Sequence, residues 1–229
     1  MMTIPRILVV LTSCDRLAWI GPPAGFRLSE FTAAWAVLTD AGWELALASP
    51  QGGAPPVDPV GDALSGRSEA TRRFLANREA RDALADTLPL DQVHAGDFDG
   101  LFYPGGTGVL GDLVVDRHSI ALIAAFAAEA KPMGFVSEAP AALLRVSKPD
   151  GTPYVAGRRL TVEDGDGTLL TDGRRLSDLL VDLGAHVMPG AAGKQHVVIH
   201  GPLVTGRNPA SADAAARALA TLVLRAAGP

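Results

Sequence analysis

The sequence holds a single cysteine, Cys14, among its 229 residues. One cysteine cannot form an intramolecular disulfide or supply the ligand pairs of a cysteine metal site. A lone cysteine is more often a small buried apolar residue than a reactive one, so no catalytic role is predicted for it. The scarcity of cysteine fits a reducing compartment, and we expect a cytoplasmic protein.

Metal-binding patterns are also missing. None of the five histidines belongs to a pair at zinc-site spacing on a predicted helix. No G-x-G-x-x-G segment or P-loop lysine is present either. The sequence therefore predicts neither a metal nor a cofactor.

Long apolar runs and clusters of basic residues are absent too. The longest apolar stretches, at 7–11 and 120–128, are far shorter than the ~20 residues that cross a bilayer. The first of them is also too short for the core of a signal peptide, and we expect it to be a strand. Lysine and arginine total 20 against 25 acidic residues, a net charge of −5, and they are scattered. A membrane protein and a nucleic-acid-binding protein are thus both disfavoured.

What the sequence does contain is short apolar runs alternating with longer segments of helical period, a pattern typical of parallel strands joined by crossover helices. The predicted strands are 7–11, 44–49, 100–103, 133–136, 159–162 and 196–199. The predicted helices are 26–41, 69–85, 119–130, 139–146, 175–183 and 210–226. The runs 155–162 and 196–205 could instead form a small antiparallel extension at one sheet edge. We predict one α/β domain spanning residues 1–229.

The segment 131–144 joins an apolar strand to a helix through Ser137 and Glu138, and Pro140 suits the first helical turn. Such a corner is typical of a nucleophile elbow, which holds one side chain at the mouth of the sheet beside the positive end of a helix. Alternatively, Ser137 and Glu138 merely cap the helix.

A glycine-rich turn follows another predicted strand directly. Gly105 and Gly106 lie in the sequence Pro-Gly-Gly-Thr-Gly at 104–108. Glycines allow a tight turn whose backbone N–H groups face a bound anion or oxyanion. Such turns are common, so this one indicates a functional site only in combination with the predicted nucleophile elbow.

Taken together, several segments in this order resemble the DJ-1/PfpI superfamily, and most of all its glyoxalase III and holding-chaperone branch within the class I glutamine amidotransferase-like fold. The segments that carry the resemblance are 25–30, 48–50, 70–75, 104–108, 131–144 and 195–211. The resemblance runs from Ile7 to about Leu222. It implies a flavodoxin-like three-layer sandwich with a mostly parallel central sheet and a site at the carboxyl ends of its strands. It also implies a homodimer, since members of the family often pair.

The elbow departs from the family pattern Ala-Val-Cys-His-Gly-Pro. Here it reads Phe-Val-Ser-Glu-Ala-Pro at 135–140, so Ser137 stands for the nucleophilic cysteine and Glu138 for the histidine. The family glutamate that bonds the cysteine falls on Glu30. The resemblance assigns the oxyanion donors to the loop at Gly105 and Gly106 and to the backbone N–H of Glu138. Asp164 and Asp166 lie near the position of the family's third, acidic member.

A serine hydroxyl is far less acidic than a thiol and needs a positioned base. Two carboxylates, Glu30 and Glu138, would lie near the Ser137 hydroxyl, and like charges in a partly apolar site raise one pKa towards the range of a general acid or base. We therefore predict an enzyme without a cofactor, a lyase, hydratase, isomerase or hydrolase that acts on a carbonyl-containing small molecule. This hypothesis requires Ser137 to lie open to a cleft.

Substrate-lining roles are predicted for Trp19, Phe26, Thr107 and Phe135, with Trp35 as a further aromatic candidate that suits the core better. The aromatic rings would favour a larger, flatter substrate than methylglyoxal. The alternative is that these aromatic rings belong to the core, which suits Phe135 better than Trp19. Richness in Ala, Arg, Gly and Pro is typical of a GC-rich bacterial genome, where such folds can serve secondary metabolism.

Two other functions stay open at this point. A non-catalytic ligand-binding protein or holding chaperone would explain the loss of both Cys and His. Retained glyoxalase or deglycase activity would follow from the resemblance alone.

Overall fold

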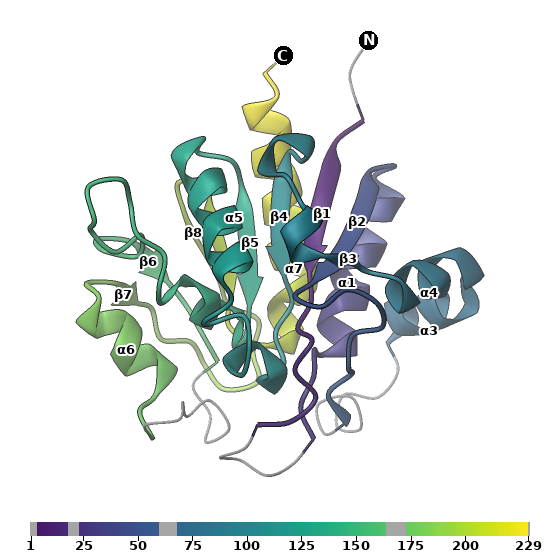
Figure 1. The fold of residues 1–229 in the computed structure, drawn as a ribbon, viewed down its shortest axis with the longest axis horizontal. Coiled ribbons are helices and arrows are strands. Elements are labelled where there is room, and N and C mark those ends of the chain that lie inside the picture. Colours follow the sequence, from purple (N-terminus) through teal and green to yellow (C-terminus); the bar gives the residue numbers. More distant parts are fainter. Residues whose placement is uncertain (1–3, 18–22, 60–67, 164–172, 229) are drawn as a thin grey trace.

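The computed structural model describes residues 4–17, 23–59, 68–163 and 173–228. Their main feature is a seven-stranded sheet in which every neighbouring pair is parallel except the last, β9 with β8 (Figure 1). In sheet order the strands are β3 (Leu88–Pro89), β2 (Glu44–Ser49), β1 (Arg6–Val10), β4 (Gly100–Tyr103), β5 (Met133–Val136), β9 (Leu203–Gly206) and β8 (Val197–His200). A separate parallel pair joins β6 (Arg159–Leu160) to β7 (His186–Val187).

Helices cover both faces of this sheet. The α-helices are α1 (Leu28–Asp40), α3 (Glu69–Ala76), α4 (Arg78–Ala85), α5 (Arg117–Ala128), α6 (Leu176–Asp182) and α7 (Ala212–Ala226). The 3-10 helices are η1 (Leu90–Gln92), η2 (Ala95–Asp97), η3 (Thr107–Leu110), η4 (Ala139–Leu143) and η6 (Pro209–Ser211). Among the described helices, none combines the length and the apolar character that crossing a bilayer would demand.

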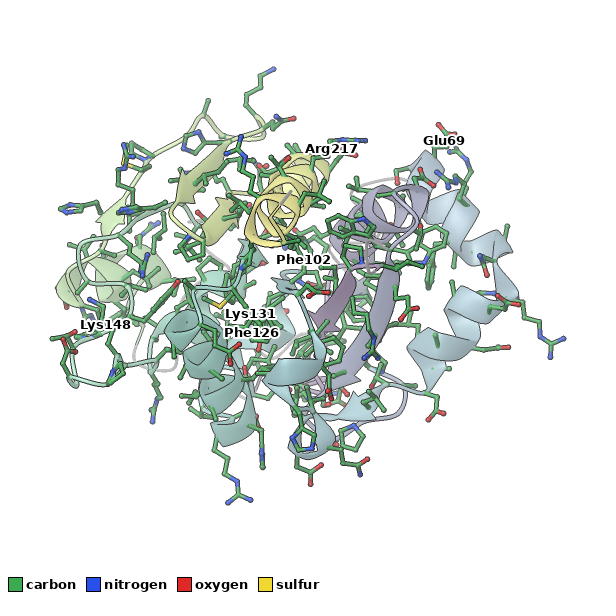
Figure 2. All side chains as sticks on the ribbon, turned by 90° about the horizontal axis from the view of Figure 1, so that it is seen from above. Glu69, Phe102, Phe126, Lys131, Lys148 and Arg217 are labelled. Atoms are coloured by element: carbon green, nitrogen blue, oxygen red, sulfur yellow. The ribbon has the colours of Figure 1, made fainter. Side chains whose placement is uncertain are left out.

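Side chains alternate between the two faces of each strand and so build two separate cores. On β1, Ile7 and Val9 join the cluster formed with α1, α3 and α7, whereas Leu8 and Val10 join the cluster formed with α5, η3 and η4. Phe102 of β4 lies fully buried near the centre of the molecule, while Glu69 and Arg217 lie at its periphery (Figure 2). This is the flavodoxin-like three-layer α/β sandwich that the sequence predicts.

Three predicted elements differ from the structure. The predicted helix 69–85 is two helices, because Asn77 adopts an extended conformation and its side chain accepts the Ala80 N–H at 3.0 Å, capping α4. The predicted helix 139–146 is the shorter 3-10 helix η4. The predicted strand 159–162 pairs with β7 outside the main sheet.

The sheet edge formed by β9 and β8 shows whether the antiparallel extension left open by the sequence is present. The strand β9 was not predicted on its own, but it pairs parallel with β5 and antiparallel with β8. The antiparallel extension that the sequence left open is therefore present for 197–206. It places Gly206 directly beside the end of β5, where the elbow begins.

Candidate active site

The elbow at the end of β5 has the sharp bend that the sequence predicts. Ser137 has a φ of 55°, one of two non-glycine residues in the described chain with a positive φ. This left-handed conformation costs a residue with a Cβ about 1 kcal/mol or more, so the surrounding structure must hold it. Its N–H donates to the Gly206 carbonyl at 2.9 Å, and its carbonyl accepts the Glu163 N–H at 3.0 Å.

The Ser137 side chain does not cap the following helix. Its hydroxyl donates instead to Oε1 of Glu30 at 2.6 Å. Glu138, at the N-cap of η4, likewise makes no side-chain capping bond there. The capping interpretation is therefore wrong for both residues.

Glu30 reaches this hydroxyl from the first turn of α1. It is fully buried, and its Oε2 accepts the Gly105 N–H at 2.7 Å. Burial raises the pKa of the Glu30 carboxyl, and the nearby Glu138 carboxylate adds to this, whereas Arg27 and the hydrogen bonds oppose it. The residue is a buried acid whose proton affinity is increased.

An arginine that sequence reasoning missed lies between the two carboxylates. Arg27 Nη1 donates to Glu30 Oε1 at 2.9 Å and to Ser137 Oγ at 3.2 Å, and its Nη2 donates to Glu138 Oε1 at 2.9 Å. Burial alone would lower the pKa of the Arg27 guanidinium, but the attraction of the two carboxylates holds it above its usual range. The signal was available, because Arg27 precedes Glu30 by three residues, a spacing that allows side chains near a helix start to meet.

The Glu138 carboxylate accepts a hydrogen bond from the Gly106 N–H, the backbone donor that we expected to bind an oxyanion. Its Oε2 accepts the Gly106 N–H at 2.9 Å, while its Oε1 takes the Arg27 bond. Gly105 leaves the space for this contact, since a Cβ there would lie 2.7 Å from Glu138 Oε2 and 2.7 Å from Ser137 Cβ. The amide that the resemblance assigns to an oxyanion thus already binds a carboxylate of the same chain.

The site is closed to solvent in this conformation. Ser137 and Glu30 are 0% exposed, Glu138 is 3% exposed, and the Arg27 side chain is 12% exposed. The expectation that Ser137 lies open to a cleft is therefore wrong. The physical reason is the ion pair between Arg27 and Glu138, whose side chains pack against the hydroxyl and replace solvent.

A third carboxylate, Glu163, lies close enough to interact with this group. Burial raises the pKa of Glu163, and repulsion from Glu138 acts in the same direction. Asp164 and Asp166, the candidates for the family's acidic third member, lie outside the described residues.

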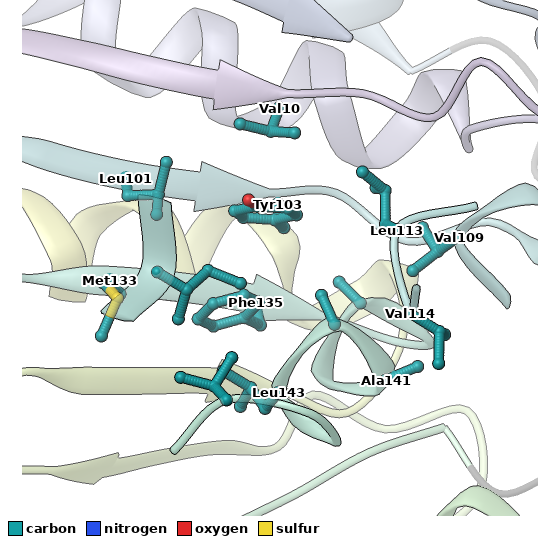
Figure 3. Packing of buried hydrophobic residues seen from close by; sticks show 14 of the residues in the cluster. Val10, Leu101, Tyr103, Val109, Leu113, Val114, Met133, Phe135, Ala141 and Leu143 are labelled. Carbon is teal, nitrogen blue, oxygen red and sulfur yellow. The ribbon is translucent and has the colours of Figure 1, made fainter. Parts of the chain in front are cut away.

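The four predicted substrate-lining residues lie in different surroundings. Phe26 and Phe135 are fully buried core residues: Phe26 packs edge-on against Phe31, and Phe135 stacks on Tyr103 with ring centroids 5.0 Å apart (Figure 3). A lining role for these two rings is thus not supported, because each belongs to one of the two hydrophobic clusters. The Thr107 hydroxyl contacts Asp58 Oδ2 at 3.5 Å, and Trp19 lies outside the described residues.

Within the described chain, no group of three or more His, Cys, Asp or Glu side chains is arranged to hold a metal ion. Cys14 is half-buried, and its thiol donates to the Arg16 carbonyl at 3.2 Å. Burial raises the pKa of that thiol, which disfavours the reactive thiolate.

A parallel α/β sandwich with a strained strand-to-helix corner beside a glycine-rich loop defines a class of proteins whose sites lie at the carboxyl ends of the strands. Residues 20–222 match the model of the DJ-1/PfpI family, and the chain belongs to that family. Among curated proteins, none matches the chain in sequence.

Solved structures share this fold at low sequence identity. The Rapid Encystment Protein 24 kDa of Francisella tularensis is 23% identical with a TM-score of 0.88, covering 96% of this chain and 99% of that one. Glyoxalase III of Candida albicans is 21% identical with a TM-score of 0.85, covering 95% and 97% of the two chains. DJ-1beta of Drosophila melanogaster is 20% identical with a TM-score of 0.63, covering 98% and 96%. These likenesses show the common fold.

Proposed function

We propose that the chain is an enzyme that needs no cofactor and catalyses proton transfer on a carbonyl-containing small molecule. The observation that carries the proposal is the 2.6 Å hydrogen bond between the Ser137 hydroxyl and the buried Glu30 carboxylate. A carboxylate of raised pKa that is held within hydrogen-bonding distance of a hydroxyl can serve as a general acid or base. The roles follow from the contacts of each residue.

Glu30 is the group that takes and returns the proton, since burial increases its proton affinity. Ser137 donates a hydrogen bond to the reacting oxygen or relays the proton. Arg27 stabilises negative charge on that oxygen through its Nη1, which lies 3.2 Å from Ser137 Oγ. In the closed conformation no substrate reaches Ser137, so the proposed catalysis requires the site to open. Glu138, predicted from the sequence to exchange protons, is ion-paired instead and must leave Arg27 and the Gly106 N–H for the substrate to bind.

Deuterium incorporation tests this proposal without knowledge of the natural substrate. Small aldehydes, ketones and 2-oxo acids are incubated with the protein in D2O, and the loss of C–H signals next to the carbonyl is followed by proton NMR. We expect at least one compound to exchange about 10²-fold faster than in buffer, and Glu30→Gln to abolish the acceleration. Glu129→Gln, an exposed carboxylate, is the control and should leave the rate unchanged. No acceleration across the panel, or full activity of Glu30→Gln, would reject the proposal.

A second candidate function is favoured by the burial of Ser137 beneath Arg27 and Glu138. A site filled by its own side chains suits a non-catalytic family member that binds a ligand or holds unfolded clients. In that case no compound in the panel would exchange, and suppression of client aggregation would survive in Ser137→Ala.

Glyoxalase activity is the third candidate, since a glyoxalase III from Candida albicans shares the fold. Here a serine paired with a carboxylate stands where the family has a cysteine, and a neutral hydroxyl adds poorly to an aldehyde. We expect no more lactate from methylglyoxal than Ser137→Ala produces. A homodimer, which the family resemblance implies, stays a prediction for light scattering to check.

A further inference from the structure

The Glu138 carboxylate lies in a binding site built from two different donors. Its Oε1 accepts from the Arg27 guanidinium and its Oε2 from the Gly106 backbone N–H, both at 2.9 Å. A guanidinium on one oxygen and a backbone amide on the other suits the planar shape and the charge of a carboxylate. With 3% exposure, the group is bound much as a buried ligand would be.

Neither donor depends on Glu138 for its position. The Arg27 N–H donates to the Gly105 carbonyl at 2.8 Å, and its Nη1 is held by Glu30. Gly106 is the N-cap of η3, and its carbonyl accepts the Val109 N–H at 3.2 Å. If Glu138 leaves, we therefore expect both donors to stay in place, where the Arg27 guanidinium and the Gly106 N–H lack a hydrogen-bond acceptor.

The charges limit what can replace it. Arg27 is one cation between two carboxylates, and burial already raises the pKa of Glu30. A further anion added beside Glu138 would bring uncompensated charge into a site closed to solvent, at a high energetic cost. A neutral oxygen in its place would leave the Arg27 charge less well compensated. The replacement that keeps the balance is another carboxylate.

We propose that Arg27 and the Gly106 N–H form a binding site for the carboxylate of a small organic acid, which displaces Glu138 from these donors. As an assignment of the substrate class this rests on the proposed function, whereas the binding site stands without it. Glu138 is then an internal competitor that keeps the site filled until the acid arrives.

The contacts of the Arg27 guanidinium also indicate where the remaining atoms of the bound acid would lie. Its Nη2 bonds the carboxylate position while its Nη1 lies 3.2 Å from Ser137 Oγ and 2.9 Å from Glu30 Oε1. A carbonyl or C–H group directly next to the carboxylate would therefore face Ser137 and Glu30. The structure thus favours short 2-oxo or 2-hydroxy acids over simple aldehydes.

Chemical rescue tests the site. Glu138→Ala removes the atoms from Cγ to the two carboxylate oxygens, which together have the size and shape of acetate. We expect this variant to melt well below the wild type and to gain about 3 °C or more in Tm as acetate is added, in a saturable manner. Propionate, which is larger, and chloride at the same ionic strength should give less than half of this rise.

Two controls separate a bound acetate from a general salt effect. The double variant Arg27→Gln/Glu138→Ala retains the vacated space without the guanidinium, and its Tm should not respond specifically to acetate. Glu129→Ala, which removes an exposed carboxylate, should respond to acetate no more than to chloride. Equal effects of acetate and chloride on Glu138→Ala, or an equal rise in the double variant, would overturn the proposal.

A measurement on the wild type covers the case in which Glu138→Ala does not fold. The Nε signal of Arg27, assigned through Arg27→Lys, is followed by 15N NMR during titration with glyoxylate, a short acid with a carbonyl next to its carboxylate. A saturable shift supports the site, and a signal unmoved by glyoxylate up to about 50 mM, far above a Kd on the order of 1 mM, contradicts it.

The outcome is independent of the test for catalysis. Acetate rescue without deuterium exchange would leave the binding site standing and reject the enzyme. Deuterium exchange of neutral carbonyl compounds without acetate rescue would support the enzyme and reject the carboxylate-binding site.

Discussion

At the scale of single residues, the site is a balance of charges around one hydroxyl. Ser137 and Glu30 form a short hydrogen bond, and Arg27 compensates both Glu30 and Glu138 in a place that water does not reach. Sequence reasoning predicted the two carboxylates near Ser137, because family motifs marked both. It missed Arg27, since an arginine beside a helix start is usually solvated, and only the burial of its partners makes it part of the site.

Arg27→Gln tests this balance. The substitution leaves two buried carboxylates without a cation, so we expect the free energy of unfolding at pH 7 to fall by about 3–5 kcal/mol in urea titrations. The loss should be smaller at pH 5, where the buried Glu30 carboxyl, whose pKa is raised, takes up a proton more easily. Arg73→Gln, which breaks an exposed ion pair with Asp40, should cost less than about 1 kcal/mol. If the two substitutions cost the same, the buried pair has no special role.

At the scale of elements, the segment 69–85 shows how one side chain divides a helix. Its composition predicts a continuous helix, because thirteen of its seventeen residues are Ala, Leu, Arg or Glu, which are good helix formers. Asn77 does so because its side-chain oxygen satisfies the free Ala80 N–H and starts a second helix in a new direction. The resulting α4 has no fully buried residue, and Ala80 and Leu84 pack against the core only half-buried, so we expect its stability to depend on this cap as well.

Hydrogen exchange checks the role of the cap. Asn77→Ala should make the amides of α4 exchange about fivefold faster, which corresponds to a cap of ~1 kcal/mol, while the strand amides stay unchanged. Asn77→Asp keeps a side-chain acceptor and should preserve the wild-type rates. Equally fast exchange in both variants would mean that side-chain capping does not hold α4.

At the scale of the whole molecule, the loops at the carboxyl ends of the strands are tied together by a buried acid. Asp112 accepts the Thr12 hydroxyl and the Ser13 N–H, each at 2.7 Å, and so connects the end of β1 with the chain after η3. Burial raises the pKa of Asp112 to about 6 from the ordinary value of 3.8. The folded protein therefore holds this proton more tightly than the unfolded chain does.

The sign of the pH dependence follows from this difference. A carboxyl group with a raised folded pKa stabilises the fold most when it is protonated, so its contribution falls as the pH rises from about 4 to 6. The complete loss is about 3 kcal/mol, of which about 2 kcal/mol falls between pH 4 and 6 and a little over ~1 kcal/mol between pH 5 and 7.5. Unfolding free energies from urea titrations should therefore decline more steeply over pH 5–7.5 in the wild type than in Asp112→Asn. Parallel curves would show that Asp112 does not titrate in this way.

The sequence by itself determined the fold class, the parallel strands β1, β2, β4 and β5, the bend at Ser137 and its carboxylate neighbour Glu30. The strands and the bend follow from local patterns, namely apolar runs of strand length and a strand-to-helix corner, whereas the flavodoxin-like class and the place of Glu30 follow from the resemblance to the family. Only the tertiary structure decided that β9 stands between β5 and β8, that Phe26 and Phe135 are core, and that Arg27 and Glu138 close the site. These features depend on contacts between residues as much as 111 positions apart. Charged side chains form ion pairs where the fold buries them, because an unpaired buried charge is costly, and are hydrated where the fold leaves them exposed. The sequence alone does not show which of the two applies.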